Sequence, residues 1–146
     1  MNSRICREVM HSENLTCVIA DESRIIFKSD KKGIVPMLEF LEIWEKGEVK
    51  PLYQSDRIIG KAAVIISNHC GIKEIYADVI SQSAYNIAER KNIKVYYDQL
   101  VEMILNPVKT KEGPFEAALH GIDEDDFTAV LATVRETLKK IQAMKK

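Results

Sequence analysis

The first third of the chain alternates short apolar and polar blocks. Residues 15–20 and 24–27 are two β-prone runs separated by the polar residues 21–23, a spacing that favours an antiparallel β-hairpin. Residues 2–13 predict a short polar helix before this hairpin. After it, Pro36 opens a pattern of apolar residues at helical spacing that lasts until Gly47.

A third helix is predicted in the middle of the chain. Residues 51–53 indicate a short strand, and Ser55 and Asp56 then offer side chains that suit a helix N-cap. Apolar residues from position 58 onward follow 3.6-residue spacing, and Gly71 is well placed to end the helix. Because this helix is apolar around much of its circumference, we expect it to pack against a sheet.

The second half of the chain alternates strands with helices. We expect strands at residues 74–80 and 94–97, with a helix at 84–91 between them that begins at Ser81–Ser83. Acidic residues open, and lysines close, an amphipathic C-terminal helix at 123–146. The order of elements predicts one α/β domain over residues 1–146, in which an initial antiparallel hairpin makes the sheet mixed.

The amino-acid composition limits the class of protein but says little about the chemistry that the protein performs. The chain has 146 residues, 46% of them hydrophobic, and a formal net charge of −1. This balance suits a compact domain and gives no electrostatic attraction to nucleic acid or to an anionic membrane. The three cysteines are widely spaced, and no cysteine–histidine cluster suggests a metal site or another cofactor. No long apolar segment or signal peptide is evident, so we expect a cytoplasmic protein.

The pair Gly60-Lys61 raises the question of phosphate binding. A P-loop requires G-x-x-x-x-G-K-[ST], but this chain has Ser55 at the first glycine position and Ala62 at the hydroxyl position. A weaker possibility is that helix amides and the lysine attract an anion together. The alternative is that Gly60 only packs against a strand and Lys61 is solvated.

Other polar residues have structural explanations as well as chemical ones. Asp56 suits a helix cap, in which case its carboxylate would not be free for acid–base chemistry. Ser81 and Ser83 suit a cap in the same way, and no G-x-S-x-G sequence surrounds them. Cys70 lies at the predicted C-terminal end of a helix, where the dipole does not favour a thiolate.

Several short motifs occur in an order that resembles a known family. They are Asp56-Arg-Ile-Ile-Gly60-Lys61-Ala-Ala63, Ser81-x-x-Ala84, Ile93-Lys-Val-Tyr-Tyr97, Ile104-Leu-Asn106 and Gly113-Pro114-Phe115-Glu116. Their order and spacing are similar to those of the prokaryotic family called domain of unknown function 1893. The fold of that family is similar to that of the cytidine deaminases.

The resemblance implies a three-layer α/β/α sandwich with a mixed sheet. In zinc deaminases, H-x-E and P-C-x-x-C begin two neighbouring helices and hold the metal. The matching positions here lie near Asp56 to Lys61 and near Ser81 to Ala84, and they contain no histidine or cysteine, so zinc-dependent deamination is not expected. The family pattern also has Asn-Arg at Asn106-Pro107 and Cys-Pro at Gly113-Pro114, so this chain lacks that arginine and that cysteine.

These observations lead to a hypothesis of zinc-independent binding of a small anionic or nucleotide-like ligand. The candidate ligand-binding residues are Asp56, Gly60, Lys61, Ser81, Asn106 and Glu116. A metal-free enzyme is the alternative, with Asp56 or Glu116 as general base and Lys61 as electrostatic stabiliser. A third hypothesis is a homo-oligomer in which the C-terminal helix or a sheet edge joins subunits. The apolar stripe that would mark the helix runs along Phe127, Val130, Leu131, Val134, Leu138 and Ile141.

Overall fold

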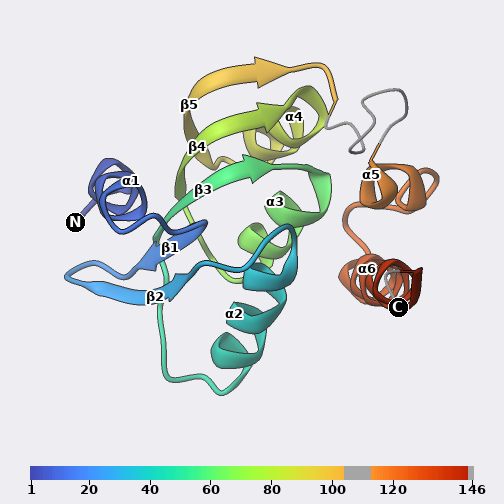
Figure 1. Ribbon diagram of the computed structural model, residues 1–146, viewed down its shortest axis with the longest axis horizontal. Helices are drawn as coiled ribbons and strands as arrows, with labels where there is room; N and C mark the ends of the chain where they lie inside the picture. The colour runs from blue at the N-terminus through green and yellow to red at the C-terminus, as the bar shows by residue number, and fades with distance from the viewer. Residues whose placement is uncertain (104–112, 145–146) are drawn as a thin grey trace.

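A five-stranded mixed sheet forms the centre of the computed structural model, which describes residues 1–103 and 113–144 (Figure 1). The strand order across the sheet is β2-β1-β3-β4-β5. The strands are β1 (Cys17–Ala20), β2 (Ile25–Ser29), β3 (Tyr53–Ile59), β4 (Glu74–Ser81) and β5 (Lys94–Val101). The strands β1 and β2 form the predicted antiparallel hairpin, which is therefore confirmed.

The direction of the strands changes inside the sheet. β1 pairs with β3 in antiparallel fashion, whereas β3, β4 and β5 are parallel to one another. Parallel neighbours need crossover connections, which α3 (Lys61–His69) and α4 (Gln82–Arg90) provide. The expectation of a mixed α/β sheet that begins with a hairpin is confirmed.

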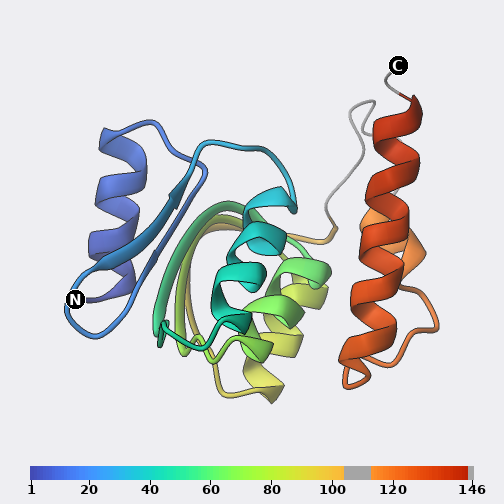
Figure 2. The same ribbon diagram turned by 90° about the horizontal axis from the view of Figure 1, so that it is seen from below.

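Helices cover the two faces of the sheet unequally. Figure 2 shows α1 (Ser3–Ser12) against one face, and α2 (Val35–Glu45), α3 and α4 against the other. The short α5 (Pro114–Ala118) and the long α6 (Phe127–Met144) lie beyond the ends of α3 and α4, and both pack against α3. No helix in the described ranges is both long and apolar enough to cross a lipid bilayer.

Each face of the sheet has its own apolar core. The smaller core lies under α1 and contains Cys6, Met10, Val18 and Ala20. The larger core lies under α2, α3 and α4 and includes Phe40 and Ile66, both fully buried. All three cysteines are buried, and burial raises the pKa of Cys6 and of Cys70 to about 12, so these thiols are packing groups rather than nucleophiles.

The prediction of a helix that starts at Ser55 and Asp56 is wrong. These residues lie within β3, which runs without interruption to Ile59, and α3 begins only at Lys61 with Gly60 as its N-cap. The β-branched pair Ile58 and Ile59 favours a strand, and pairing with β1 and β4 on both sides decides the outcome. Helical spacing of apolar residues is misleading at this point, because a strand and a helix follow each other directly.

The C-terminal helix begins later than expected. It starts at Phe127 rather than near Asp123, and the Asp126 carboxylate accepts a hydrogen bond of 3.1 Å from the Ala129 amide. The acidic residues at 123–126 thus precede the helix, with Asp126 as its cap. The apolar stripe of this helix is partly covered by the protein itself, because Val130 and Val134 are buried.

Gly71 ends α3 as expected. Its backbone has φ = +90°, a conformation that residues with a side chain adopt at a cost, although an added methyl group would meet no atom within 4 Å. We expect Gly71→Ala to lower the free energy of unfolding by about 1–2 kcal/mol through backbone strain alone. Urea denaturation checks this value, and Gly71→Asn should lose less, because asparagine tolerates this conformation better.

Candidate functional site

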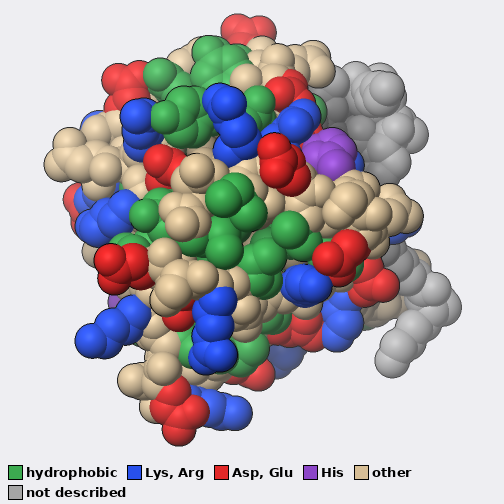
Figure 3. Space-filling model, turned by 90° about the vertical axis from the view of Figure 1, so that its left-hand side faces the viewer, with side chains coloured by type: hydrophobic (Ala, Val, Ile, Leu, Met, Phe, Trp, Pro, Cys, Tyr) green, Lys and Arg blue, Asp and Glu red, His purple; other side chains and the backbone are tan. Residues whose placement is uncertain are grey.

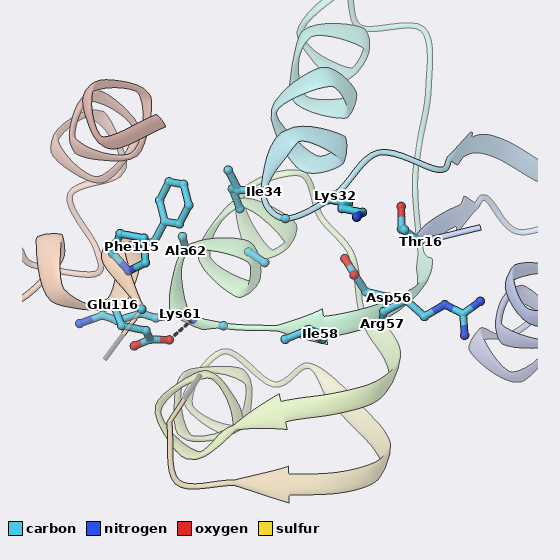
Figure 4. A pocket seen from close by; sticks show the side chains of 15 residues that line it. Thr16, Lys32, Ile34, Asp56, Arg57, Ile58, Lys61, Ala62, Phe115 and Glu116 are labelled. Atoms are coloured by element: carbon cyan, nitrogen blue, oxygen red, sulfur yellow. Dashed lines mark hydrogen bonds between the residues drawn. The ribbon is translucent and has the colours of Figure 1, made fainter. Parts of the chain in front are cut away.

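A cavity of about 400 Å³ opens at the end of β3, where the parallel and antiparallel parts of the sheet meet. Four segments surround it: the start of β1, the loop before α2, the β3–α3 junction and the start of α5 (Figure 4). The described residues that line it are Thr16, Lys32, Gly33, Ile34, Asp56, Arg57, Ile58, Gly60, Lys61, Ala62, Ala63, Gly113, Pro114, Phe115 and Glu116. Most of these walls are apolar, and the charged groups lie at two separate ends.

Asp56 occupies one end of the cavity. It lies on β3 opposite Cys17 of β1, and in Figure 4 its carboxyl group points toward Lys32 and Thr16. The residue is only 7% exposed. Burial raises the pKa of Asp56 to about 8, although the amides of Ile58 and Arg57 and the Gln54 side chain favour the ionised form. The carboxyl group is therefore largely protonated at neutral pH and does not cap a helix.

Arg57 follows Asp56 in β3, and its side chain leaves the cavity toward α1, as Figure 4 shows. Its guanidinium group donates to the Leu15 carbonyl at 2.9 Å and to the Asp78 carboxylate at 3.3 Å. Asp78 also accepts from His11 at 2.9 Å and from Arg7 at 3.3 Å. Arg57 thus ties α1 to the sheet, and this charged cluster keeps its guanidinium group away from the protonated Asp56.

Glu116 occupies the other end of the cavity. One of its carboxylate oxygens accepts a hydrogen bond of 2.8 Å from the Lys61 amide, and the other accepts 3.1 Å from the Ser83 hydroxyl. Ser81 in turn caps α4 by accepting a hydrogen bond of 3.2 Å from the Ala84 amide, which confirms the predicted cap. Glu116 therefore joins the N-terminal ends of α3 and α4, where a carboxylate is favoured by both helix dipoles.

The predicted anion position at Gly60-Lys61 is thus filled from within the protein. The Lys61 amide, which was expected to attract a ligand, already donates to Glu116. Gly60 is the N-cap of α3 and lines the cavity, as the hypothesis of a pocket required. An external anion would have to use lysine side chains or displace Glu116.

The candidate residues divide into two groups. Gly60, Lys61, Ser81 and Glu116 come together at the helix starts, whereas Asp56 lies at the opposite end of the same cavity (Figure 4). Asn106 lies outside the described residues. Asp56 and Glu116 therefore do not form a carboxylate pair.

Sequence reasoning missed the wall contributed by Thr16, Lys32, Ile58 and Phe115. The antiparallel pairing of β1 with β3 brings Thr16 beside the end of β3, since Cys17 lies opposite Asp56. Ile58 is 54% exposed, which is unusual for an isoleucine and places apolar surface at the mouth of the cavity. Strand pairing and the packing of α5 are long-range properties, so the local sequence contains no signal for this wall.

A metal site is not evident in the described part of the chain, where no group of three or more histidine, cysteine, aspartate or glutamate side chains is placed to hold an ion.

The comparison with protein families is decisive for classification. Residues 5–138 match the model of a family described as a domain of unknown function, DUF1893. The chain belongs to the DUF1893 family.

A solved structure agrees with this assignment. A DUF1893 family protein (TM1506) from Thermotoga maritima has 22% sequence identity to this chain and a TM-score of 0.75. The match covers 94% of this chain and 88% of that protein. At this identity, the likeness establishes a shared fold. Among curated proteins, the search found no match.

Proposed function

We propose that this DUF1893 protein binds a small, nucleotide-like molecule in the cavity, with Asp56 as the polar anchor. The observation that carries the proposal is a buried carboxyl group that opens on an otherwise mainly apolar cavity of about 400 Å³. This volume is within the range of small-molecule sites, and such sites combine apolar walls with a few polar groups. A buried acid with a raised pKa is also costly for stability, which is typical of functional sites.

The protonation state of Asp56 defines what it can bind. A neutral carboxyl group has one hydrogen-bond donor and one acceptor side by side. It is complementary to a ligand edge on which a donor lies next to an acceptor, as in an amide or a nucleobase. Because Ile34, Ile58 and Phe115 give the cavity apolar walls, a flat ring suits the space better than a strongly hydrated group.

An anionic group of the ligand would be attracted by lysine side chains. Lys32 lies at the Asp56 end and Lys61 at the Glu116 end, and both line the cavity (Figure 4). Since Glu116 already accepts from the Lys61 amide, the α3 backbone contributes less to anion binding than the sequence suggested. The polar anchor is therefore Asp56, and any phosphate would be held near the cavity mouth.

A deaminase-like ancestry without zinc is part of the proposal. The starts of α3 and α4 are linked by Glu116, and they follow two adjacent parallel strands, β3 and β4. This arrangement supports the likeness to the cytidine deaminases that the motifs suggested. In this interpretation, Glu116 and the Ser81 cap stabilise a position that holds metal ligands in the zinc enzymes.

Titration with nucleoside 5′-monophosphates, followed by amide NMR spectra, tests the proposal. We expect shifts in residues that line the cavity, including Thr16, Ile58 and Phe115, and binding that weakens as the pH rises through about 8, because ionised Asp56 loses its donor. Asp56→Asn should bind at pH 7 and remain able to bind at pH 9, because an amide also presents a donor beside an acceptor.

Asp56→Leu is the matched control, since it keeps the branching of the side chain at Cγ and removes both hydrogen-bonding groups. We expect it to lower affinity by about tenfold or more, which corresponds to one buried hydrogen-bonding interaction. Native mass spectrometry of freshly purified protein extends the search to ligands that co-purify. The proposal is wrong if no nucleotide shifts the cavity residues and no small molecule co-purifies.

A metal-free enzyme is the second candidate, and the raised pKa of Asp56 favours it. A carboxyl group with a pKa near operating pH can both donate and accept a proton. Glu116 is less suited to this role, because both of its oxygens accept hydrogen bonds. Comparison of the natural protein with Asp56→Asn separates the two functions. An enzyme would convert the ligand, and its variant would bind the ligand without turnover. A binding protein would leave the ligand unchanged in both forms.

A further inference from the structure

Exposed apolar side chains gather along one edge of the sheet. Seven large hydrophobic residues of the described chain are exposed, and four of them lie within residues 96–103. These four are Tyr96, Tyr97, Leu100 and Met103, which are 36–42% exposed. Three of them belong to β5, the last strand of the sheet, and within the described ranges no strand pairs with its outer edge.

The exposed residues follow the strand edge rather than one face of the sheet. Tyr96 stacks against Tyr76 with ring centroids 6.0 Å apart, whereas Tyr97 contacts Tyr85 of α4 on the opposite face at 5.8 Å. Hydrophobic side chains reach the surface at the top of Figure 3, the side on which Figure 1 shows β5. A partner that covered only one face would leave half of these side chains in water, whereas an added strand would cover both.

The backbone of β5 determines which residues such a strand can pair with. The Lys94 amide donates to the Lys73 carbonyl at 2.9 Å, so Lys94 directs its backbone groups toward β4. Neighbouring residues in a strand direct these groups to opposite sides. Val95, Tyr97 and Gln99 therefore direct their N–H and C=O groups to the outer edge, where no strand of the described residues pairs with them.

We propose that two copies of this chain pair through β5 in antiparallel fashion, with Tyr96 opposite Tyr96 of the second copy. Val95 of each copy then exchanges backbone hydrogen bonds with Tyr97 of the other, because both residues direct their N–H and C=O groups to the outer edge. The two five-stranded sheets become one continuous sheet of ten strands. This inference is independent of the ligand proposed above.

Charge complementarity selects this register among those that the backbone allows. With Tyr96 at the two-fold axis, Lys94 of each copy lies directly opposite Asp98 of the other, which forms two cross-strand pairs of opposite charge. Within its own copy Asp98 already pairs with Arg7 and accepts a hydrogen bond of 3.0 Å from the Tyr76 hydroxyl, so Lys94 of the second copy would join an existing cluster. A shift that centred the axis on Asp98 would place two aspartates opposite each other, which is destabilising. Lys94 is exposed and stacks over the Tyr96 ring at 5.2 Å, so its ammonium group already lies near the expected axis.

The opposite edge of the sheet is less suited to pairing. β2 has only five residues, carries Lys28 and pairs with β1 through an irregular register between Ile19 and Ala20. Short strands, lysines and bulges are features that discourage edge-to-edge association. β5 has eight residues with no proline or irregularity in its pairing with β4. The second copy is therefore expected at β5.

Disulfide trapping tests the register. In this dimer Tyr96 forms a pair without backbone hydrogen bonds, whose Cα atoms lie about 4.5 Å apart, within the range of a disulfide. We expect Tyr96→Cys to form a covalent dimer under mild oxidation, whereas Tyr97→Cys, the adjacent matched control, should not. The native cysteines are buried and do not compete. Sedimentation of the unmodified protein should show a dimer that dissociates on dilution.

A charge exchange provides a second test that needs no new covalent bond. Lys94→Glu should weaken the dimer at least tenfold, because it places a second carboxylate opposite Asp98. Asp98→Lys places two lysines opposite each other and should weaken the dimer at least as much, because it also removes the contacts of Asp98 with Arg7 and with the Tyr76 hydroxyl. A mixture of the two variants should restore association, because each lysine again faces a carboxylate. The proposal is overturned if the protein is monomeric at 100 µM, if Tyr97→Cys crosslinks instead of Tyr96→Cys, or if Lys94→Glu leaves the dimer unchanged.

Discussion

Replacement of Asp56 by asparagine is expected to stabilise the folded protein strongly at pH 8 and above. Burial raises the pKa of this carboxyl group to about 8, from an ordinary value of 3.8. The folded state therefore retains a proton on Asp56 between about pH 4 and pH 8, whereas the unfolded state releases it. Stability must fall as the pH rises through this interval, because unfolding releases a proton there.

The magnitude follows from the same pair of values. A difference of about four in pKa corresponds to about 5 kcal/mol at pH values above 8, and to almost nothing below pH 4. Asparagine has nearly the same shape and remains neutral, so it removes this penalty while keeping a side-chain acceptor at the same position. The variant should therefore gain stability relative to the natural protein as the pH rises.

Urea denaturation of both proteins between pH 4.5 and pH 9 measures this difference. We expect the two free energies of unfolding to diverge with a slope of about 1.4 kcal/mol per pH unit over most of this interval. Asp30→Asn is the control, because Asp30 is exposed. Parallel curves for Asp56→Asn and the natural protein would show that the carboxyl group is not buried as described.

Removal of the Glu116 carboxylate should have the second largest effect. Glu116→Ala breaks the hydrogen bonds to the Lys61 amide and the Ser83 hydroxyl, and it leaves the α3 N-terminus without a carboxylate. Charge-assisted hydrogen bonds contribute about 1.5–3 kcal/mol, so we expect a loss of about 2–3 kcal/mol in the free energy of unfolding. The loss should decrease in 50 mM phosphate, because an anion can then bind the exposed amide.

Glu116→Gln is the matched control for this prediction. Glutamine keeps the length of the side chain and one acceptor, so it should lose only about 1 kcal/mol and should not respond to phosphate. Thermal denaturation with phosphate and with an equal ionic strength of chloride distinguishes anion binding from general screening. If Glu116→Ala is as stable as the natural protein, Glu116 does not hold the helix ends together.

Local sequence patterns predicted most of the fold. The polar interruption at 21–23 located the hairpin, and Gly71, Ser81 and the strand at 74–80 were correct, because turns, caps and β-branched runs depend mainly on neighbouring residues. The error at residues 55–59 has a different origin. Pairing with β1 and β4 overrides the helical spacing there, and a local pattern contains no information about strand partners.

The candidate site was predicted only in part, for a related reason. Gly60, Lys61 and Glu116 were selected individually, but their sequence separation gave no indication that Glu116 would fill the α3 N-terminus. The sequence predicts Asp56 as a helix cap, because its burial on a strand becomes visible only when the sheet is assembled. Residue types thus indicate candidate chemistry, and tertiary contacts determine which of the candidate residues lie together.

The bridge from Glu116 to α3 and α4 also bears on the order in which the chain acquires its structure. Glu116 is 55 residues from Lys61 and 33 from Ser83, so this contact closes longer loops than the pairing of β3 with β4, and we expect it to form later. During synthesis the sheet leaves the ribosome before α5 does. The last wall of the cavity therefore comes from α5, after the whole sheet has been synthesised. A nascent or truncated protein that lacks α5 would have a sheet with an open groove at this position.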